Sequence, residues 1–367
     1  MEPMSRKTAT GLTHDLVLPT LLFAALGAMT WAVRGCSGFG AMNGCVFAGV
    51  TWGTAWWYIA RQPSARQPRA YASGWIILAL TVGIGISGAR GWMQWPSFFL
   101  GHLQTNVAAG QWVPISSAYG FLWLFVAGVP WAGLGACALA WCGSHRPARW
   151  GGWAIRVGCG AGAVVLARFL FDRFPELFLP LYTNMKSQYA DLEANPNLRR
   201  LIADNRAAIT HLGLYLGLLT AEVARNDRRN VILIGTVGVL NGLGWALCQN
   251  WQWARGFWPG ANFNWWRCWE SSGGISIGIA YGVAYYLVNR PMSASAQATG
   301  ASRPLDRRPE WEQFGAYLGL LFGLGLSVKN GLKGWANIYL GNEEYWNQVL
   351  WWIIGPAMLL GLVGLAF

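Results

Sequence analysis

Long apolar runs separated by shorter polar stretches are the dominant pattern of the chain. Each run is 17 to 25 residues long, and charged residues rarely interrupt it. Because a helix needs about 20 apolar residues to cross a hydrocarbon layer of about 30 Å, each run predicts one membrane-spanning helix. The ten predicted spans cover residues 16–33, 42–60, 73–89, 118–142, 151–168, 207–224, 230–248, 271–289, 312–328 and 347–366. The pattern therefore predicts an all-α, polytopic integral membrane protein.

Composition supports the same class. Of the 367 residues, 54% are hydrophobic and only 11% are charged, whereas a soluble globular domain carries about 25% charged residues. This shortage of charge excludes a secreted, cytosolic or disordered chain. Residues 1–15 are polar, and no small-residue cleavage site follows the first apolar run. We therefore interpret that run as a spanning helix and not as a removable signal peptide.

The positive charges predict how the chain is oriented. The net charge is +12, and with a cytoplasmic N-terminus the inner segments carry 14 Lys and Arg residues against six in the short outer connections. Lys and Arg concentrate on the cytoplasmic side of a membrane protein, so we expect both termini to be cytoplasmic and the protein to lie in the cell (inner) membrane. The arginines punctuate apolar runs instead of lining one face. Membrane lipids are therefore expected partners, and nucleic acid is not.

The chain also matches itself. Residues 49–61 align without a gap on residues 278–290, and residues 82–87 align on residues 322–327. Two matches in the same order predict a duplicated four-helix unit, and the even number of spans between the copies makes them parallel. Chance similarity between glycine-rich helices is the alternative. The predicted organisation is a cytoplasmic N-terminus (1–15), repeat A (16–142), spans 5 and 6 (143–229) with an extracytoplasmic cap (169–206), and repeat B (230–367) with a cytoplasmic linker (290–311).

Small residues within the spans predict close helix packing. Glycines recur at four-residue spacing, as in Gly49 and Gly53 or in Gly274, Gly278 and Gly282, which places them on one helix face. Cysteines allow two interpretations. Cys36–Cys45 and Cys248–Cys268 could form disulfides in the outer connections if that compartment is oxidising, or they are free thiols in tightly packed helices.

Four outer connections are too apolar for ordinary loops and too polar for ordinary spans. Such segments survive at membrane depth only where protein or a wet cavity satisfies their backbone, which predicts re-entrant loops. Flat indole faces beside amide groups suit sugar rings, and arginines bind carboxylate, sulfate or phosphate through parallel hydrogen bonds. An ordinary aromatic belt at the membrane interface is the alternative. The candidate substrate-binding residues are Trp31, Arg34, Asn43, Arg90, Trp92, Gln94, Trp95, Gln249, Asn250, Trp251, Arg255, Asn262, Asn264, Arg267, Lys329, Asn330, Lys333 and Trp335.

Two residues are candidates for acid–base chemistry. Glu270 is the only acid in the densest aromatic cluster, where it is either half of a structural ion pair or a functional acid. His102 is the only histidine in the candidate site. Glu222 stands beside Arg225 and is interpreted as part of a surface pair. Zinc and nucleotide motifs are absent from the sequence, so no metal and no cofactor is predicted.

Three functions remain open on these observations. The first is a permease or transporter-like protein with an outer cavity for a small polar or anionic solute, with a sugar or sugar acid favoured. The second is an integral-membrane enzyme that acts on a lipid-linked or surface glycan from the outer face, and the third is a non-catalytic scaffold that binds a partner or lipid. The duplication favours transport. A transporter also needs a polar route through the inner half of the membrane, where the spans have few polar side chains, mainly Thr51, Thr54, Asn241 and Ser276. This shortage favours the enzyme and the scaffold.

Overall fold

The computed structural model describes residues 12–36, 41–61, 69–88, 95–143, 148–248, 251, 257–262, 264–289 and 309–366. Each predicted span overlaps one helix in this part of the chain, although α4, with 13 residues, is shorter than the span predicted for it. These helices are α2 (Leu18–Cys36, preceded by the π-turn η1, Thr13–Val17), α3 (Ala41–Ala60), α4 (Trp75–Ser87), α6 (Ala118–Cys142), α7 (Trp150–Arg173), α10 (Pro196–Ala224), α11 (Arg228–Cys248), α13 (Trp265–Val288), α15 (Pro309–Leu340) and α16 (Glu343–Ala366). Six of them are long and apolar enough to cross a membrane, as an all-α membrane protein requires.

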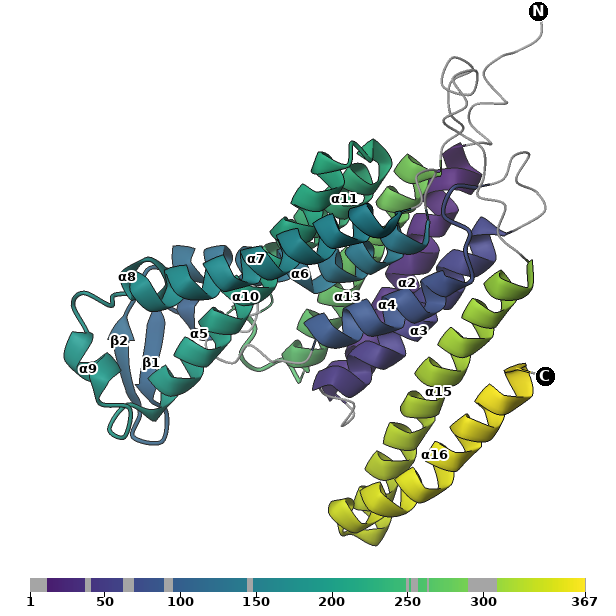
Figure 1. Cartoon of the computed structure of the whole chain (residues 1–367). Helices are drawn as coiled ribbons and strands as arrows, with labels where there is room; N and C mark the ends of the chain where they lie inside the picture. Colours follow the sequence, from purple (N-terminus) through teal and green to yellow (C-terminus); the bar gives the residue numbers. More distant parts are fainter. Residues whose placement is uncertain are drawn as a thin grey trace, which may run out of the picture.

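Six helices form the body of the molecule as a closed ring. In the order α2, α3, α4, α6, α11 and α13, each helix packs against the next, and α13 packs against α2 (Figure 1). Aromatic side chains fill the centre of the ring, among them the fully buried Trp52, Trp245 and Tyr281. Large rigid rings therefore supply the core that leucine and isoleucine supply in many helical proteins.

Glycines set the closest contact in this ring. A Cβ on Gly274 would lie 2.0 Å from the carbonyl oxygen of Gly27, and a Cβ on Gly278 would lie 2.1 Å from the carbonyl oxygen of Phe23. These contacts run in opposite directions along the two helices, so α2 and α13 are antiparallel. The predicted close packing of the glycine faces is confirmed here, because any side chain would push the two backbones apart.

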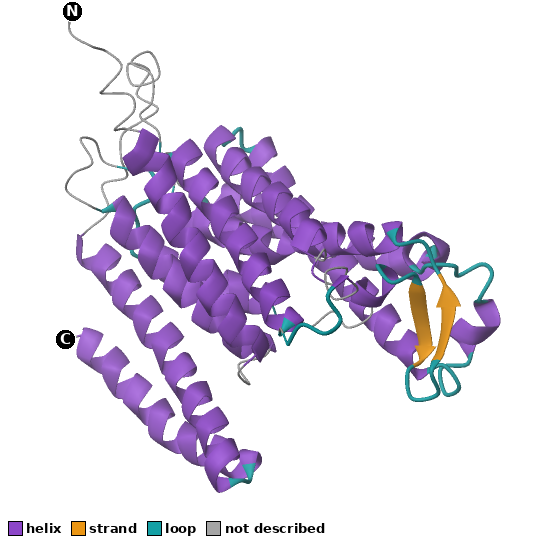
Figure 2. Ribbon diagram, turned by 180° about the vertical axis from the view of Figure 1, so that it is seen from behind, coloured by secondary structure: helices purple, strands orange, loops and turns teal. Residues whose placement is uncertain are grey.

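A helical arm carries a small lobe away from the ring. Helices α7 and α10 pack side by side, and α10 also packs against α6. At their far ends lie α5 (Trp95–Phe98), α8 (Pro175–Phe178), α9 (Lys186–Ala190) and a hairpin of strands β1 (His102–Asn106) and β2 (Gln111–Pro114), as Figures 1 and 2 show. This hairpin differs from the re-entrant loop expected after the third span. Alternating burial along β1 explains it, because strands place successive side chains on opposite faces.

The α15–α16 hairpin stands partly apart from the ring (Figures 1 and 2). Helix α15 packs against α3 and α4, and α16 packs against α15. Large apolar side chains of α16 are exposed, with Trp352 at 81%, as lipid-facing helices require. In a symmetric duplication α15 would pack on α13 as α4 packs on α3, whereas α15 packs on α3, α4 and α16. The duplication therefore stays a prediction.

Candidate binding site at a buried ion pair

The ring encloses an ion pair between α2 and α13. Arg34 Nη1 donates to Glu270 Oε2 at 3.5 Å, and the two side chains are only 8% and 2% exposed. Arg34 lies in the last turn of α2, where the carbonyl end of a helix favours a cation. Removing two charges from water costs several kcal/mol for each ion unless they are paired. The glycine contact of α2 with α13 brings the two residues opposite each other and so makes this pairing available.

Tryptophan rings hold the guanidinium in place. The Cζ atom of Arg34 lies 5.2 Å from the centroid of the Trp31 ring and 4.8 Å from that of Trp131, so each ring face stabilises the cation. Trp31 also stacks on Trp52, with centroids 5.6 Å apart and planes 12° apart. We call five residues from five helices of the ring the tryptophan cluster. They are Trp31, Trp52, Trp131, Trp245 and Trp269.

The site has more hydrogen-bond donors than acceptors. Arg34 Nε and the indole nitrogens of Trp31, Trp52 and Trp269 are buried and have no hydrogen-bond partner among the described residues. Guanidinium and indole groups donate and cannot accept, and buried donors in folded proteins normally have an acceptor. Glu270 is the carboxylate that α13 places among them. The chemistry of the site therefore suits an additional ligand rich in acceptor oxygens, such as a carboxylate, a sulfate, a phosphate or a sugar.

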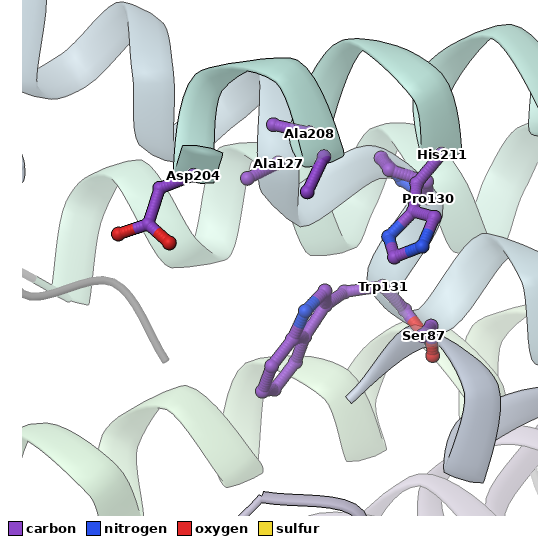
Figure 3. A pocket seen from close by; sticks show the side chains of 8 residues that line it. Ser87, Ala127, Pro130, Trp131, Asp204, Ala208 and His211 are labelled. Carbon is purple, nitrogen blue, oxygen red and sulfur yellow. The ribbon is translucent and has the colours of Figure 1, made fainter. Parts of the chain in front are cut away.

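A small pocket is lined in part by Trp131. Its lining comes from the end of α4, the middle of α6 and α10 (Figure 3). Trp131 and His211 face this space from α6 and α10, and Asp204 lies one to two helical turns before His211. Because the Trp131 ring borders the pocket and also contacts Arg34, it connects the pocket with the ion pair. The residues that line the pocket are Ser87, Ala127, Pro130, Trp131, Asp204, Ala207, Ala208 and His211.

Of the predicted site residues, the structure brings Trp31, Arg34 and Glu270 together. Two others have structural partners. The fully buried Trp95 donates from its indole to Asn205 Oδ1 at 2.8 Å. The side chain of Asn264 caps α13 by accepting from the backbone of Arg267 at 3.0 Å.

The remaining candidates of α3 and of the connection before α13 lie near the surface. Trp251 is 38% exposed and donates from its indole to Ser272 Oγ at 3.0 Å. Asn262 and Arg267 are exposed, and Asn43 is half-buried near the start of α3. Six further candidates lie outside the described residues, namely Arg90, Trp92, Gln94, Gln249, Asn250 and Arg255.

The candidates on the α15–α16 hairpin form a group of their own. Lys329 contacts Asn330 and Asn347, and its ammonium lies 4.7 Å from the centroid of the Trp351 ring. Lys333 Nζ donates to Glu343 Oε1 at 2.6 Å, and the half-exposed Trp335 packs on Tyr339. All these contacts stay within the hairpin. This group is therefore separate from Arg34 and Glu270.

His102 lies in the lobe, where its ring stacks on Trp112 with centroids 3.8 Å apart. Glu270 is on α13, where it pairs with Arg34 of α2. The two candidates for acid–base chemistry are therefore not neighbours.

A second buried ion pair is missing from the sequence-based candidates. Arg156 Nε lies 2.5 Å from Glu222 Oε1, and the side chains are 2% and 0% exposed. Asn230 Nδ2 donates to Glu222 Oε2 at 2.9 Å, and the Tyr71 hydroxyl donates to Asn230 Oδ1 at 2.6 Å. The interpretation of Glu222 as a surface residue is wrong, because α7 places an arginine opposite it. The sequence did contain an indication of this pair, because Arg156 is a lone charge inside an apolar run and such a charge normally has a buried partner.

The polar side chains expected in the inner half of the membrane hydrogen-bond to helix backbones. The hydroxyls of Thr51, Thr54 and Ser276 donate to carbonyls three or four residues earlier in their own helices, at 2.7–2.8 Å. Asn241 donates to the carbonyl of Gly128 on α6 at 2.5 Å. These side chains satisfy backbone groups in an apolar surrounding, as membrane helices require.

The described cysteines of the outer connections are free thiols. Cys45 is buried, and Cys248 and Cys268 are half-buried. The disulfide between Cys248 and Cys268 that an oxidising compartment would permit is therefore not present in the structure. The side chain of Cys36 lies outside the described residues.

Comparisons of the chain with protein-family models, with curated proteins and with solved structures gave no match. The function is therefore argued from the site alone.

Proposed function

We propose that this protein is a permease-like membrane protein that binds a small anionic or polar solute at Arg34. The observation that carries the proposal is the state of the guanidinium. It is held between two indole faces, but its ion pair with Glu270 is a single contact of 3.5 Å, and its Nε has no partner among the described residues. Guanidinium has five N–H donors and binds carboxylate best through two parallel hydrogen bonds. Among the described residues, the Glu270 carboxylate and the Cys45 thiol contact this guanidinium, which leaves N–H donors that a solute can use.

The aromatic surroundings favour a sugar acid among the anions. A sugar acid combines a carboxylate for Arg34 with a ring whose C–H face packs on flat aromatic surfaces and whose hydroxyls accept hydrogen bonds from indoles. The unpartnered indoles of Trp31, Trp52 and Trp269 supply such donors.

The proposal includes the topology that the charges predict. Both termini are cytoplasmic, ten helices span the membrane, and spans 1–4 and 7–10 are parallel copies. The carbonyl end of α2 and the lobe then face outward. Because the described inner half is packed, uptake requires the ring of helices to open toward the cytoplasm after the solute has bound, as in alternating access.

Geometry favours solute binding over a reaction on a glycan. Acid–base catalysis needs its groups within hydrogen-bond reach of one substrate. Glu270 is paired with Arg34 inside the ring, whereas His102 stacks on Trp112 in the lobe. Glu343, another carboxylate that follows the ninth predicted span, is paired with Lys333 on the α15–α16 hairpin.

Binding and uptake by the purified full chain in liposomes test the proposal. The probes are glucuronate and glucose, which differ by one carboxylate. The variants are Arg34→Gln and, as a matched control, Arg206→Gln, which removes an exposed arginine paired with Asp172 at 2.6 Å. We expect glucuronate to bind and to enter the liposomes. Arg34→Gln should weaken its binding about tenfold or more, because a hydrogen bond to a charged group contributes about 1.5–3 kcal/mol.

The control and the neutral sugar complete the test. We expect Arg206→Gln to bind glucuronate like the unaltered protein, and glucose to bind more weakly than glucuronate. Unchanged binding by Arg34→Gln would contradict the site. Binding without uptake would contradict a permease and leave a membrane protein that only binds the solute.

A further inference from the structure

The Arg34–Glu270 pair has no net charge, so an anion bound at Arg34 would give the site a net negative charge. Glu270 is 2% exposed, and its ion pair among the described residues is with Arg34. A second negative charge beside it in a poorly solvated site is strongly unfavourable, because like charges at short range disfavour the ionised forms. An anion and the Glu270 carboxylate therefore compete for the same guanidinium.

The groups around Glu270 offer no replacement cation among the described residues. Arg267, three residues before Glu270 on α13, is exposed. The pocket behind Trp131 adds the side chains of Asp204 and His211 from α10. At the opposite end of α13, Asp15 of η1 pairs with Arg69. The helices around Glu270 also carry thiols, namely Cys45 on α3, Cys137 and Cys142 on α6, Cys248 on α11 and Cys268 on α13. Their other titratable groups are Tyr58 on α3, Tyr119 on α6, Arg228 and Arg229 at the start of α11, and Tyr281, Tyr285 and Tyr286 in the second half of α13.

We propose that binding of one anion at Arg34 is coupled to the uptake of one proton by Glu270, an inference that rests on the proposed function. When the anion takes the guanidinium, a buried carboxylate remains without its partner, which is costly unless it is neutralised. One proton from solvent then binds a carboxylate oxygen of Glu270 and forms an O–H bond. No bond of the solute breaks.

The charge of the site is the same before and after this step. Before binding, Arg34 carries one positive charge and Glu270 one negative charge. After binding, the negative charge belongs to the anion, and Glu270 is neutral. The buried site therefore stays neutral throughout, and anion and proton bind in a ratio of one to one. In a permease this coupling makes the solute and the proton move together without net charge transfer.

Calorimetric titration of the full chain in detergent with glucuronate tests the coupling. The titration is done at about pH 8, where a carboxyl group paired with a guanidinium is ionised, in triethanolamine and in Tris. These two buffers are cationic, so they do not compete with the anion, and they absorb different heats on deprotonation. The difference in heat gives the number of protons taken up for each anion. We expect a value of about one, and a tenfold loss of affinity for each rise of one pH unit while Glu270 is ionised in the free protein.

Glu270→Gln is the matching variant, because it keeps the shape of the side chain and removes the titration. We expect it to bind glucuronate without proton uptake and with an affinity that does not change with pH. If the unaltered protein binds glucuronate without proton uptake, the coupling is overturned and the proposed function remains. The titration of the unaltered protein alone gives this result, so it does not depend on whether the variant folds. Uptake that persists in Glu270→Gln would overturn the role of Glu270. The absence of glucuronate binding would overturn the proposed function itself.

Discussion

Gly27 and Gly274 touch backbone to backbone, since a Cβ on Gly27 would lie 2.0 Å from the carbonyl oxygen of Gly274. Trp31 lies one turn further along α2, and Arg34 follows it. Glu270 lies one turn before Gly274 on the antiparallel α13. The contact between two glycines thus determines whether the ion pair of the ring can form.

We expect Gly274→Ala to destabilise the protein and to weaken anion binding together. The added methyl group would overlap the carbonyl oxygen of Gly27 and separate α2 from α13, and overpacking of this kind costs about 1–3 kcal/mol. Thermal unfolding in detergent measures the loss. Gly235→Ala on α11 is the control, because a Cβ there would meet nothing within 4 Å. Equal stability of the two variants would contradict the close contact.

The buried pair Arg156–Glu222 predicts a large effect of removing one partner. Glu222→Gln leaves the guanidinium of Arg156 buried without its counter-ion, which costs about 3–5 kcal/mol. The double variant Arg156→Met with Glu222→Met should recover part of this loss, because it removes the buried guanidinium of Arg156 together with its counter-ion. Arg225, which also contacts Glu222 at 3.4 Å, loses that contact in both variants, so the comparison isolates Arg156. Unfolding measurements on the two single variants and the double variant give the coupling.

Asp172→Asn is the control for this pair, since it breaks the exposed ion pair with Arg206. Exposed pairs contribute about 0–1 kcal/mol, so we expect little change in its stability. If Glu222→Gln were no more destabilising than Asp172→Asn, the pair would not be buried as described.

The lobe should lose stability in alkaline solution because of Tyr189. Burial, together with the nearby Tyr119 and Tyr182, raises the pKa of the Tyr189 phenol above its ordinary value, and its hydroxyl donates to the carbonyl of Pro180 at 2.9 Å. A raised pKa in the folded state stabilises the lobe below the pKa of the unfolded chain, about 10. This stabilisation is lost as the pH rises beyond that value.

Hydrogen exchange of the β1 and β2 amides between about pH 8 and 10.5 measures this effect after correction for intrinsic exchange rates. We expect Tyr189→Phe to be less stable at neutral pH, since it lacks the hydrogen bond, but to show a smaller alkaline loss. The same alkaline loss in both proteins would rule out Tyr189 as the cause.

Cys248 and Cys268 should both react with an alkylating reagent without prior reduction, because both are free thiols. Mass spectrometry of the denatured protein, alkylated without reductant, checks this. A mass two hydrogens lower for a linked peptide pair would reveal a disulfide and contradict the structure at this position.

Helix positions and packing faces could be predicted from the sequence because both depend on local patterns. A run of apolar residues has the length of a membrane-spanning helix wherever it lies in the chain, and the spacing of Gly274, Gly278 and Gly282 defines one helix face. Pairing across the molecule is different. Glu222 has an arginine nearby in sequence, but Arg156 from another helix is its buried partner. No local pattern contains that information.

The candidate site was predictable at Arg34, Glu270 and the neighbouring Trp31. Arg34 and Glu270 stood out because a charge at the edge of an apolar run is costly if it enters the membrane unpaired. Trp95 and Asn264 were candidates because tryptophan and asparagine are common in ligand-binding sites. In the structure Trp95 hydrogen-bonds Asn205, and Asn264 caps α13. Trp131 was missed because a tryptophan inside an apolar run has the pattern of ordinary core packing.

The most direct test of the central claim is an experimental structure of the protein with para-bromobenzoate bound. This anion carries a carboxylate for Arg34 and a flat ring for the indole faces, and the anomalous scattering of bromine locates it. The account predicts a bromine signal beside the tryptophan cluster, with the carboxylate on Arg34 and with Glu270 no longer paired to it. A bromine signal only on the α15–α16 hairpin or in the lobe, with Arg34 and Glu270 still paired, would contradict the account.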